Sequence, residues 1–470
     1  MMTTLRRNGL LALMLTVSVA ATGCSTVGRI NPFNKEKDGP KETASEGQRV
    51  AVVAFDDKVE AAEGLKGADF FLPDPKPISE WALPGATPEQ SVEHVAAGGA
   101  LDVAWRKGFG QKSNRGAHVT APPVAVNGKI YVMDGEARVS AMDAQSGATV
   151  WSVDLRPSSK RDKEAFGGGL AIADGKLYVT SGYRFVAELN ADTGAVVWKK
   201  PTEQPIHGAP TVSGGRMFAV AIDNTLMTFD AATGAEGWNY QALSESARIL
   251  AASSPAVSGD TVVAAFGSGE LVALRTGNGN DLWNEALSRA SRTNALSEIR
   301  DIPGRPVIYQ GDVFAVSHSG VFAATDLRTG QARWTLPITG ITTPWAAGDV
   351  VYVVGKDGKI YCAARETGQV YWIRDLNIDR VKKGGGSFFN RFGKSTNKKS
   401  KIVRPVWSSP ILANGRLVIG SDTGEIVALN AKTGVVEKSV QVKSPLLIGP
   451  IALNGTLYFA TDEAQLIALR

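Results

Sequence analysis

The sequence predicts an all-β protein whose main part, residues 101–470, is a single eight-bladed β-propeller. Glycine contributes 51 of the 470 residues, which indicates many tight turns. A glycine turn between two apolar runs recurs about every 47 residues, a period typical of propeller blades. In most repeats, a second turn that ends in glycine precedes a tryptophan. The eight recurring turn glycines are Gly128, Gly175, Gly215, Gly259, Gly311, Gly348, Gly415 and Gly455.

Each repeat reads as four short strands joined by three turns. An apolar run and a glycine turn come first, and an alternating run such as Lys176–Thr180 follows. This pattern predicts a four-stranded antiparallel meander whose turns use glycine at positive φ. Because such a sheet is apolar on both faces, it must stack on neighbours. Eight copies therefore predict a closed ring that leaves no long exposed edge.

The recurrent tryptophan is expected to wedge between adjacent blades. In the fourth repeat Trp283 follows Thr276-Gly277 two residues later than the usual spacing. In the seventh repeat Lys438 stands where the tryptophan would be. The six tryptophans that follow a glycine turn are Trp151, Trp198, Trp238, Trp283, Trp334 and Trp372.

The two ends of the propeller region complement each other. The last repeat, residues 450–469, provides three strands and lacks the fourth. Residues 101–107 have the alternation and the tryptophan, Trp105, of a fourth strand, but no Thr-Gly turn precedes them. We therefore expect the N-terminal strand to complete the last blade and close the ring.

The first residues predict export and a lipid anchor. Residues 1–23 have a positive start, an apolar stretch and a small-residue end, which is typical of a signal peptide. Ala21-Thr22-Gly23-Cys24 resembles a bacterial lipobox, which implies lipidation of Cys24. Ser25 in place of aspartate implies the periplasmic face of the outer membrane, with this lipid as the only membrane anchor. The alternative is an ordinary secretory signal in which Cys24 is incidental.

Two segments depart from the repeat pattern. Residues 24–100 are predicted to be a lipidated, largely extended tether, because much of their composition is polar or proline-bearing. Residues 376–405 form an insertion with nine basic residues and one acidic residue. The insertion is either a solvated loop or a contact for an acidic partner or anionic lipid. Because it accounts for the basic pI, that pI does not indicate nucleic-acid binding.

The Thr-Gly and tryptophan repeat resembles that of quinoprotein alcohol dehydrogenases. That resemblance implies pyrroloquinoline quinone beneath a disulfide of adjacent cysteines, and a calcium ion held by carboxylates. The cysteines of this chain, Cys24 and Cys362, are far apart, and residues 101–470 contain no Asp-Asp or Asp-x-Asp cluster. We therefore predict no catalytic residue, no cofactor and no enzyme activity. A quinoprotein-like periplasmic oxidoreductase, or a propeller that binds a small ligand in its channel, is the alternative.

A lipoprotein signal, a tether and a lone eight-bladed propeller together resemble the BamB family of the outer-membrane β-barrel assembly machinery. The resemblance covers the whole mature chain. It implies a non-catalytic scaffold that docks on the periplasmic domains of the barrel protein BamA. It also implies help in the folding and insertion of nascent outer-membrane proteins.

The same resemblance implies a docking surface made of two inter-blade loops. The first falls at Ala247–Leu250 and the second at Glu298–Pro303. Proline replaces the second acidic residue of the family at position 303, and the arginine of the first loop is displaced. We expect both loops to be exposed, although simple linkage between blades is the alternative. The implied partner-binding residues are Arg248, Ile249, Leu250, Glu298 and Asp301.

Overall fold

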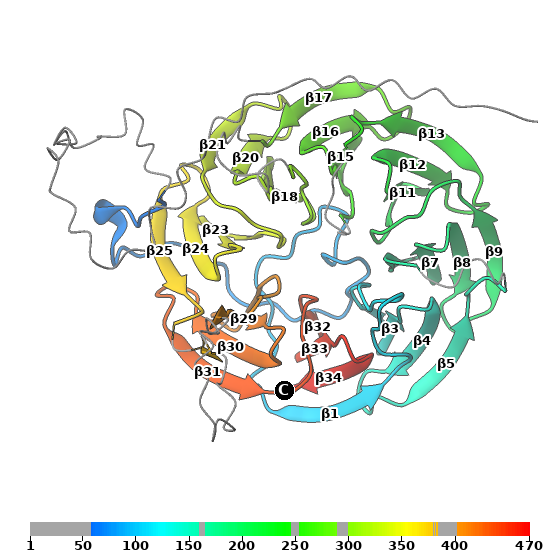
Figure 1. Ribbon diagram of the computed structural model, residues 1–470, viewed down its shortest axis with the longest axis horizontal. Coiled ribbons are helices and arrows are strands. Elements are labelled where there is room, and N and C mark those ends of the chain that lie inside the picture. The colour runs from blue at the N-terminus through cyan, green and yellow to red at the C-terminus, as the bar shows by residue number, and fades with distance from the viewer. Residues whose placement is uncertain are drawn as a thin grey trace, which may run out of the picture. The chain divides into compact units, whose positions relative to one another are not determined.

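Eight antiparallel sheets are arranged around a central axis (Figure 1). The computed structural model describes residues 58–158, 165–245, 253–288, 299–378, 380, 382–383 and 402–470. Each sheet has four strands and forms one blade, which confirms the predicted eight-bladed propeller. The blades are β2–β5 (blade 1), β6–β9 (blade 2), β10–β13 (blade 3), β14–β17 (blade 4), β18–β21 (blade 5), β22–β25 (blade 6), β28–β31 (blade 7) and β32–β34 with β1 (blade 8).

The strands of each blade run from the channel outward. The inner strands are β2 (Val124–Val126), β6 (Gly168–Ala173), β10 (Thr211–Ser213), β14 (Ala256–Ser258), β18 (Val307–Tyr309), β22 (Trp345–Ala347), β28 (Ile411–Ala413) and β32 (Ile451–Leu453). The second strands are β3 (Lys129–Met133), β7 (Lys176–Ser181), β11 (Arg216–Val220), β15 (Thr261–Ala265), β19 (Asp312–Val316), β23 (Val350–Val354), β29 (Arg416–Gly420) and β33 (Thr456–Ala460).

The third strands are β4 (Arg138–Asp143), β8 (Phe185–Asn190), β12 (Thr225–Asp230), β16 (Glu270–Arg275), β20 (Phe322–Asp326), β24 (Lys359–Ala364), β30 (Glu425–Asn430) and β34 (Gln465–Leu469). The outer strands are β5 (Thr149–Asp154), β9 (Val196–Pro201), β13 (Glu236–Gln241), β17 (Asp281–Ala286), β21 (Ala332–Leu336), β25 (Val370–Asp375), β31 (Val436–Gln441) and β1 (Val103–Gly108).

Burial explains the two hydrophobic patterns of the repeat. Second strands such as β19 and β23 are buried along their whole length, because a neighbouring blade covers each face. Outer strands such as β31 alternate between exposed and partly buried residues. The continuous apolar runs of the sequence thus form the middle of each blade, and the polar alternating runs form its rim.

In seven of the eight outer strands a tryptophan packs against a glycine of the next blade, which confirms the predicted wedge. A Cβ atom on Gly368, whose φ is +72°, would lie 2.7 Å from Cδ2 of Trp334. The indole N–H of Trp334 donates to the carbonyl of Arg365 at 2.7 Å. The seven tryptophan–glycine pairs are Trp105–Gly147, Trp151–Gly194, Trp198–Gly234, Trp238–Gly279, Trp283–Gly330, Trp334–Gly368 and Trp372–Gly434.

The structure corrects the turn of the fourth repeat. Gly279, at a φ of +74°, is the glycine that contacts Trp238, whereas Gly277 has no neighbouring atom that a Cβ would meet. Trp283 therefore lies at the usual distance from its turn glycine, and the two-residue delay inferred from Gly277 is wrong. The eight glycines predicted for the first turn of each repeat all have positive φ.

Strand β1 pairs with β34 and completes blade 8, as the sequence predicts. Asp102 and Arg470 exchange two backbone hydrogen bonds of 2.9 and 3.0 Å. No Thr-Gly turn joins β34 to its neighbour β1 in blade 8, so blade 8 offers no such turn to a tryptophan of blade 7. Lys438 takes that place and its Nζ reaches Oδ1 of Asp102 at 3.1 Å and the carbonyl of Ala100. A charged contact thus replaces the apolar wedge where the chain ends meet.

The basic insertion leaves the ring between blades 6 and 7. Its described base is a short antiparallel ladder of β26 (Lys382–Lys383) and β27 (Ile402–Val403). The Arg380 guanidinium binds both carboxylate oxygens of Glu425, at 2.8 to 3.0 Å. A bidentate pair of this kind fixes the root of the insertion to blade 7.

Replacement of Gly368 by alanine tests the wedge. Gly368→Ala and Gly415→Ala meet similar backbone strain, because their φ angles are +72° and +73°, and each should lose about 1–2 kcal/mol for it. Only Gly368 faces a tryptophan, since nothing lies within 4 Å of a Cβ on Gly415. Urea unfolding should therefore show a further loss of ~1–3 kcal/mol for Gly368→Ala. Equal losses in the two variants would contradict the wedge.

Candidate functional site

Residues 76–97, the channel segment, lie inside the ring of blades, where Figure 1 draws them as part of the blue trace across the centre. The segment makes a hydrogen bond at the inner strand of every blade. These contacts are Ile78 O to Asn454 N (2.7 Å, blade 8), Trp81 O to Ala125 N (2.8 Å, blade 1), Ala82 O to Ile172 N (2.8 Å, blade 2), Pro88 O to Val257 N (2.7 Å, blade 4), Glu89 O to Ile308 N (2.9 Å, blade 5), Gln90 Nε2 to Thr211 Oγ1 (3.0 Å, blade 3), Glu93 O to Trp345 Nε1 (2.9 Å, blade 6) and Val95 N to Leu412 O (3.0 Å, blade 7).

Many side chains of the channel segment from Trp81 onward are buried. Trp81 is 1% exposed and Val95 is fully buried. The side chain of Gln90 accepts the N–H of Gly85 and donates to Pro255 O, which holds the turn of the segment against blade 4. The propeller core therefore begins well before residue 101, and this part of the expected tether belongs to it. The only helical turn in the described residues before the blades is η1 (Glu63–Leu65).

The central channel is too small for a quinone cofactor. The cavity between the channel segment and the blades has a volume of about 40 Å³, whereas sites for cofactors of that size have roughly 300 Å³ or more. Trp81 and Trp345 fill much of the space and line what remains. The residues of the channel thus do not fit pyrroloquinoline quinone.

The other parts of a quinoprotein site do not fit either. Cys362 is a fully buried single cysteine on β24, and burial raises the pKa of its thiol, so it behaves as an apolar strand residue. Within the described ranges, no group of three or more His, Cys, Asp or Glu side chains could hold a metal ion. No redox step can be derived from these residues.

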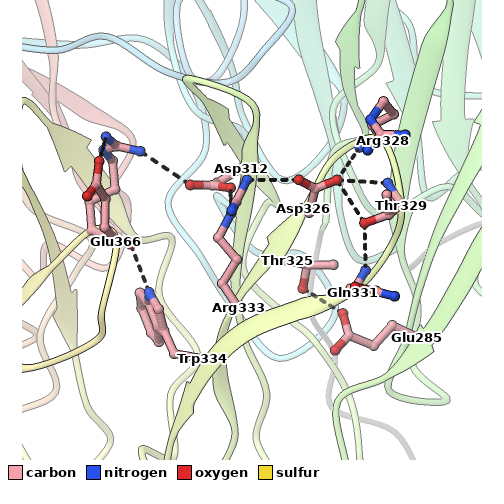
Figure 2. A network of polar contacts seen from close by, with 11 residues as sticks. Glu285, Asp312, Thr325, Asp326, Arg328, Thr329, Gln331, Arg333, Trp334 and Glu366 are labelled. Atoms are coloured by element: carbon pink, nitrogen blue, oxygen red, sulfur yellow. Dashed lines mark hydrogen bonds and ion pairs between the residues drawn. The ribbon is translucent and has the colours of Figure 1, made fainter.

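Figure 2 shows a network of charged side chains between blades 5 and 6. Asp312 is 2% exposed and pairs with two guanidinium groups, those of Arg333 and Arg365. Arg333 Nη2 also reaches Oδ2 of Asp326 at 2.8 Å, and Arg365 Nη2 reaches Oε1 of Glu366 at 3.1 Å. The carboxylates of Asp312, Asp326 and Glu366 each already have an arginine partner. The arrangement therefore ties two blades together and offers no ligand set for calcium.

The two predicted docking loops leave the same face of the ring. Each connects the outer strand of one blade with the inner strand of the next, and the blades involved are 3, 4 and 5. Their described ends meet, because Ser253 Oγ donates to the carbonyl of Gly304 at 3.2 Å. Four of the predicted partner-binding residues lie outside the described residues: Arg248, Ile249, Leu250 and Glu298.

Asp301 is 6% exposed, so the expectation that it is surface-exposed is wrong. Its carbonyl accepts the N–H of His318 at 2.8 Å, and the N–H of Ile302 donates to Phe266 O at 3.3 Å. Asp301 belongs to the connection between β17 and β18, which crosses from the rim of the ring to the channel. The connection passes between loops of blades 4 and 5, and these loops cover it. A loop at the end of a propeller is thus not exposed along its whole length.

His318 anchors the part of the second docking loop that the structure describes. Its Nε2 accepts from Lys356 Nζ at 2.7 Å, and its Nδ1 donates to Ile299 O at 3.4 Å. Burial and the nearby Lys356 charge lower the pKa of His318, so the neutral ring can accept and donate at once. Arg300, next to the anchored Ile299, has an exposed side chain. The loop therefore presents Arg300 at this face of the ring.

Comparison with protein families gives two matches. The model described as outer membrane protein assembly factor BamB matches residues 135–374 and 390–470. The model of the β-propeller domain of glucose, ethanol and alcohol dehydrogenases matches residues 96–173. The BamB match spans more than half of the chain, including blades 2 to 5 and blade 7 in full.

Curated relatives agree with the first match. The chain is 24% identical over 315 residues to the outer membrane protein assembly factor BamB of Salmonella typhimurium, which covers 66% of this chain and 74% of the relative. It is 22% identical over 327 residues to that of Moranella endobia, which covers 65% and 84%. It is 27% identical over 263 residues to that of Burkholderia pseudomallei, which covers 56% and 67%.

Solved structures share the fold. The crystal structure of BamB from Moraxella catarrhalis has a TM-score of 0.65 and 18% identity, over 78% of this chain and 99% of that one. A europium-containing methanol dehydrogenase has a TM-score of 0.61 and 14% identity, over 82% and 89%. Similarity of fold alone therefore relates this chain both to an assembly factor and to a dehydrogenase. The family model decides between them: the chain belongs to the family of the outer membrane protein assembly factor BamB.

Proposed function

We propose that this chain is a non-catalytic scaffold lipoprotein of the outer-membrane β-barrel assembly machinery. It docks on the periplasmic domains of a BamA-like barrel protein and assists the folding and insertion of outer-membrane proteins. Membership of the BamB family carries the proposal. The channel supports it, because a cavity of about 40 Å³ leaves no room for the cofactor of a propeller dehydrogenase.

The proposed docking surface is the face on which the loops between blades 3, 4 and 5 emerge. It includes Arg248, Ile249, Leu250 and Glu298, together with Arg300. The contact between Ser253 and Gly304 supports a single surface, since it joins the ends of the two loops. Asp301 is buried and does not belong to this surface; its backbone carbonyl accepts the N–H of His318 and so holds the second loop on blade 5.

We also propose that a lipid on Cys24 anchors the chain to the periplasmic face of the outer membrane. In the part of the chain that the structure describes, no helix is long and apolar enough to span a membrane. The lipobox-like residues Ala21–Cys24 support lipid attachment.

Replacement of Cys24 by serine tests the anchor. Labelled palmitate should enter the wild-type protein and not Cys24→Ser, because only a thiol at this position can receive the first lipid. The variant should also move from the membrane fraction to the soluble periplasm. Cys362→Ser is the matched control, because Cys362 is fully buried in β24, and it should keep the label. Palmitate on Cys24→Ser would contradict the anchor.

Charge reversal on opposite faces of the ring tests the docking surface. Arg300 and Arg328 are both exposed, but Arg328 follows β20 in the turn to β21, at the other face. We expect Arg300→Glu to lower recovery of a BamA-like protein from detergent-solubilised membranes by about tenfold, as loss of one interface charge pair of ~1.4 kcal/mol would do. Arg328→Glu should leave recovery unchanged.

The outcomes of that experiment separate the surface from the function. If both variants recover the barrel protein like the wild type, the assembly role stands and the docking face is wrong. If the wild-type chain recovers no barrel protein, the scaffold proposal itself fails. An absorption spectrum of the purified protein with a quinone band would then favour the oxidoreductase alternative.

A further inference from the structure

A ring of residues borders the central channel just before the inner strands. In seven blades the residue two places before the inner strand precedes a proline. Neighbouring members touch, because the N–H of Arg305 donates to Thr343 Oγ1 at 3.2 Å and the N–H of Thr343 donates to Ser409 Oγ at 2.9 Å. The seven residues are Pro122, Ala209, Ser254, Arg305, Thr343, Ser409 and Gly449. Arg305 is the one charged member of this set.

Arg305 faces the cavity between this ring and the channel segment. Its side chain lines the cavity together with Trp81 and Gln90 from the segment. No acidic side chain lies among the lining residues in the described part of the chain. Nε of Arg305 is buried and has no hydrogen-bond partner among the described atoms. Burial lowers the pKa of Arg305 to about 10, so the guanidinium remains charged at neutral pH.

Arg305 as a whole is only partly buried, but a buried guanidinium N–H without a partner is costly, and folded proteins ordinarily pair such a charge with an opposite one. A guanidinium has five N–H donors and no acceptor, so only an acceptor can complete its contacts. The cavity walls around Arg305 add hydroxyl groups that can turn toward an acceptor, those of Thr343 and Ser409. The site therefore has the positive charge and the donors that an anion requires, without a protein group to neutralise them.

We propose that the central channel binds a small monovalent anion, such as a halide ion, at the guanidinium of Arg305. The size of the cavity sets the class of ligand. Its volume is about 40 Å³, and one water needs roughly 10–15 Å³ on the same measure. A halide with one or two waters fits, whereas a nucleotide or a quinone does not. The bound anion neutralises Arg305 and so stabilises the ring at its centre.

Bromide is the probe, because its anomalous scattering locates it in a crystal. Crystals of the intact propeller soaked in sodium bromide should show an anomalous peak within hydrogen-bond distance of the Arg305 guanidinium. In solution, exchange of gluconate for 100 mM bromide at constant ionic strength should raise the Tm of the wild type by about 2 °C, because an ion that binds only the folded state stabilises it. Gluconate is too large to enter the cavity and serves as the inert counterion.

Three variants make the experiment decisive. Arg305→Gln should lose both the peak and the Tm response, and Arg305→Lys should keep them, since it retains the charge. Arg300→Gln is the matched control, because it removes an exposed arginine near the same face and should respond like the wild type. No peak in the wild type, or a peak and a Tm response that persist in Arg305→Gln, would overturn the proposal.

Discussion

Hydrogen bonds between the channel segment and the inner strands hold the eight blades together from within. Every inner strand has one edge that no strand of its own blade covers, and an unsatisfied buried peptide group costs stability. Residues 76–97 supply partners to backbone groups at that edge in six blades, and in the other two they bond the side chains of Thr211 and Trp345. Tryptophan wedges join seven of the eight neighbouring blade pairs near the rim, and the Lys438 contact joins blade 7 to blade 8. The ring is therefore fixed both at its centre and at its periphery.

The packing of the channel segment inside the ring also limits which functions the fold can have. Propeller dehydrogenases and this chain share an architecture, but architecture does not decide function. Here Trp81 and its neighbours occupy the space in which a large cofactor would have to lie, and the remaining volume is about 40 Å³. The chemistry available to the ring therefore lies on its surfaces, where partners can dock, and in Arg305, the one charged residue that lines the described central cavity.

The sequence predicts the blades well because each repeat carries its own turn signals. The turn glycines, the tryptophans and the split last blade follow directly from spacing. The predictions from sequence are wrong where tertiary packing decides which residue makes a contact or is buried. Gly279 rather than Gly277 receives Trp238, and Asp301 is buried because loops of two blades close over it. The proline-bearing channel segment has the composition of a linker, so only its contacts show that it belongs to the core.

Arg305 gives a further example of what spacing alone can and cannot indicate. In seven blades a proline comes directly before the inner strand, so the residue before that proline is a recognisable position in the repeat. An arginine among small or uncharged residues stands out there. That position could have been noted from the sequence. The absence of an acidic neighbour in the described channel lining depends on residues from several blades and from the channel segment, which spacing does not reveal.

Hydrogen exchange of the inner-strand amides in Trp81→Ala tests most directly whether the channel segment holds the inner strands together. Loss of this buried side chain should cost about 3–5 kcal/mol and open the channel segment locally. The amides of Ala125, Val257 and Ile308 should then exchange at least ~10-fold faster than in the wild type. The amide of Gly368, which bonds within its own turn to Ala364 O, should keep its protection. Inner-strand amides that stay as protected as in the wild type, in a variant that remains folded, would contradict the account.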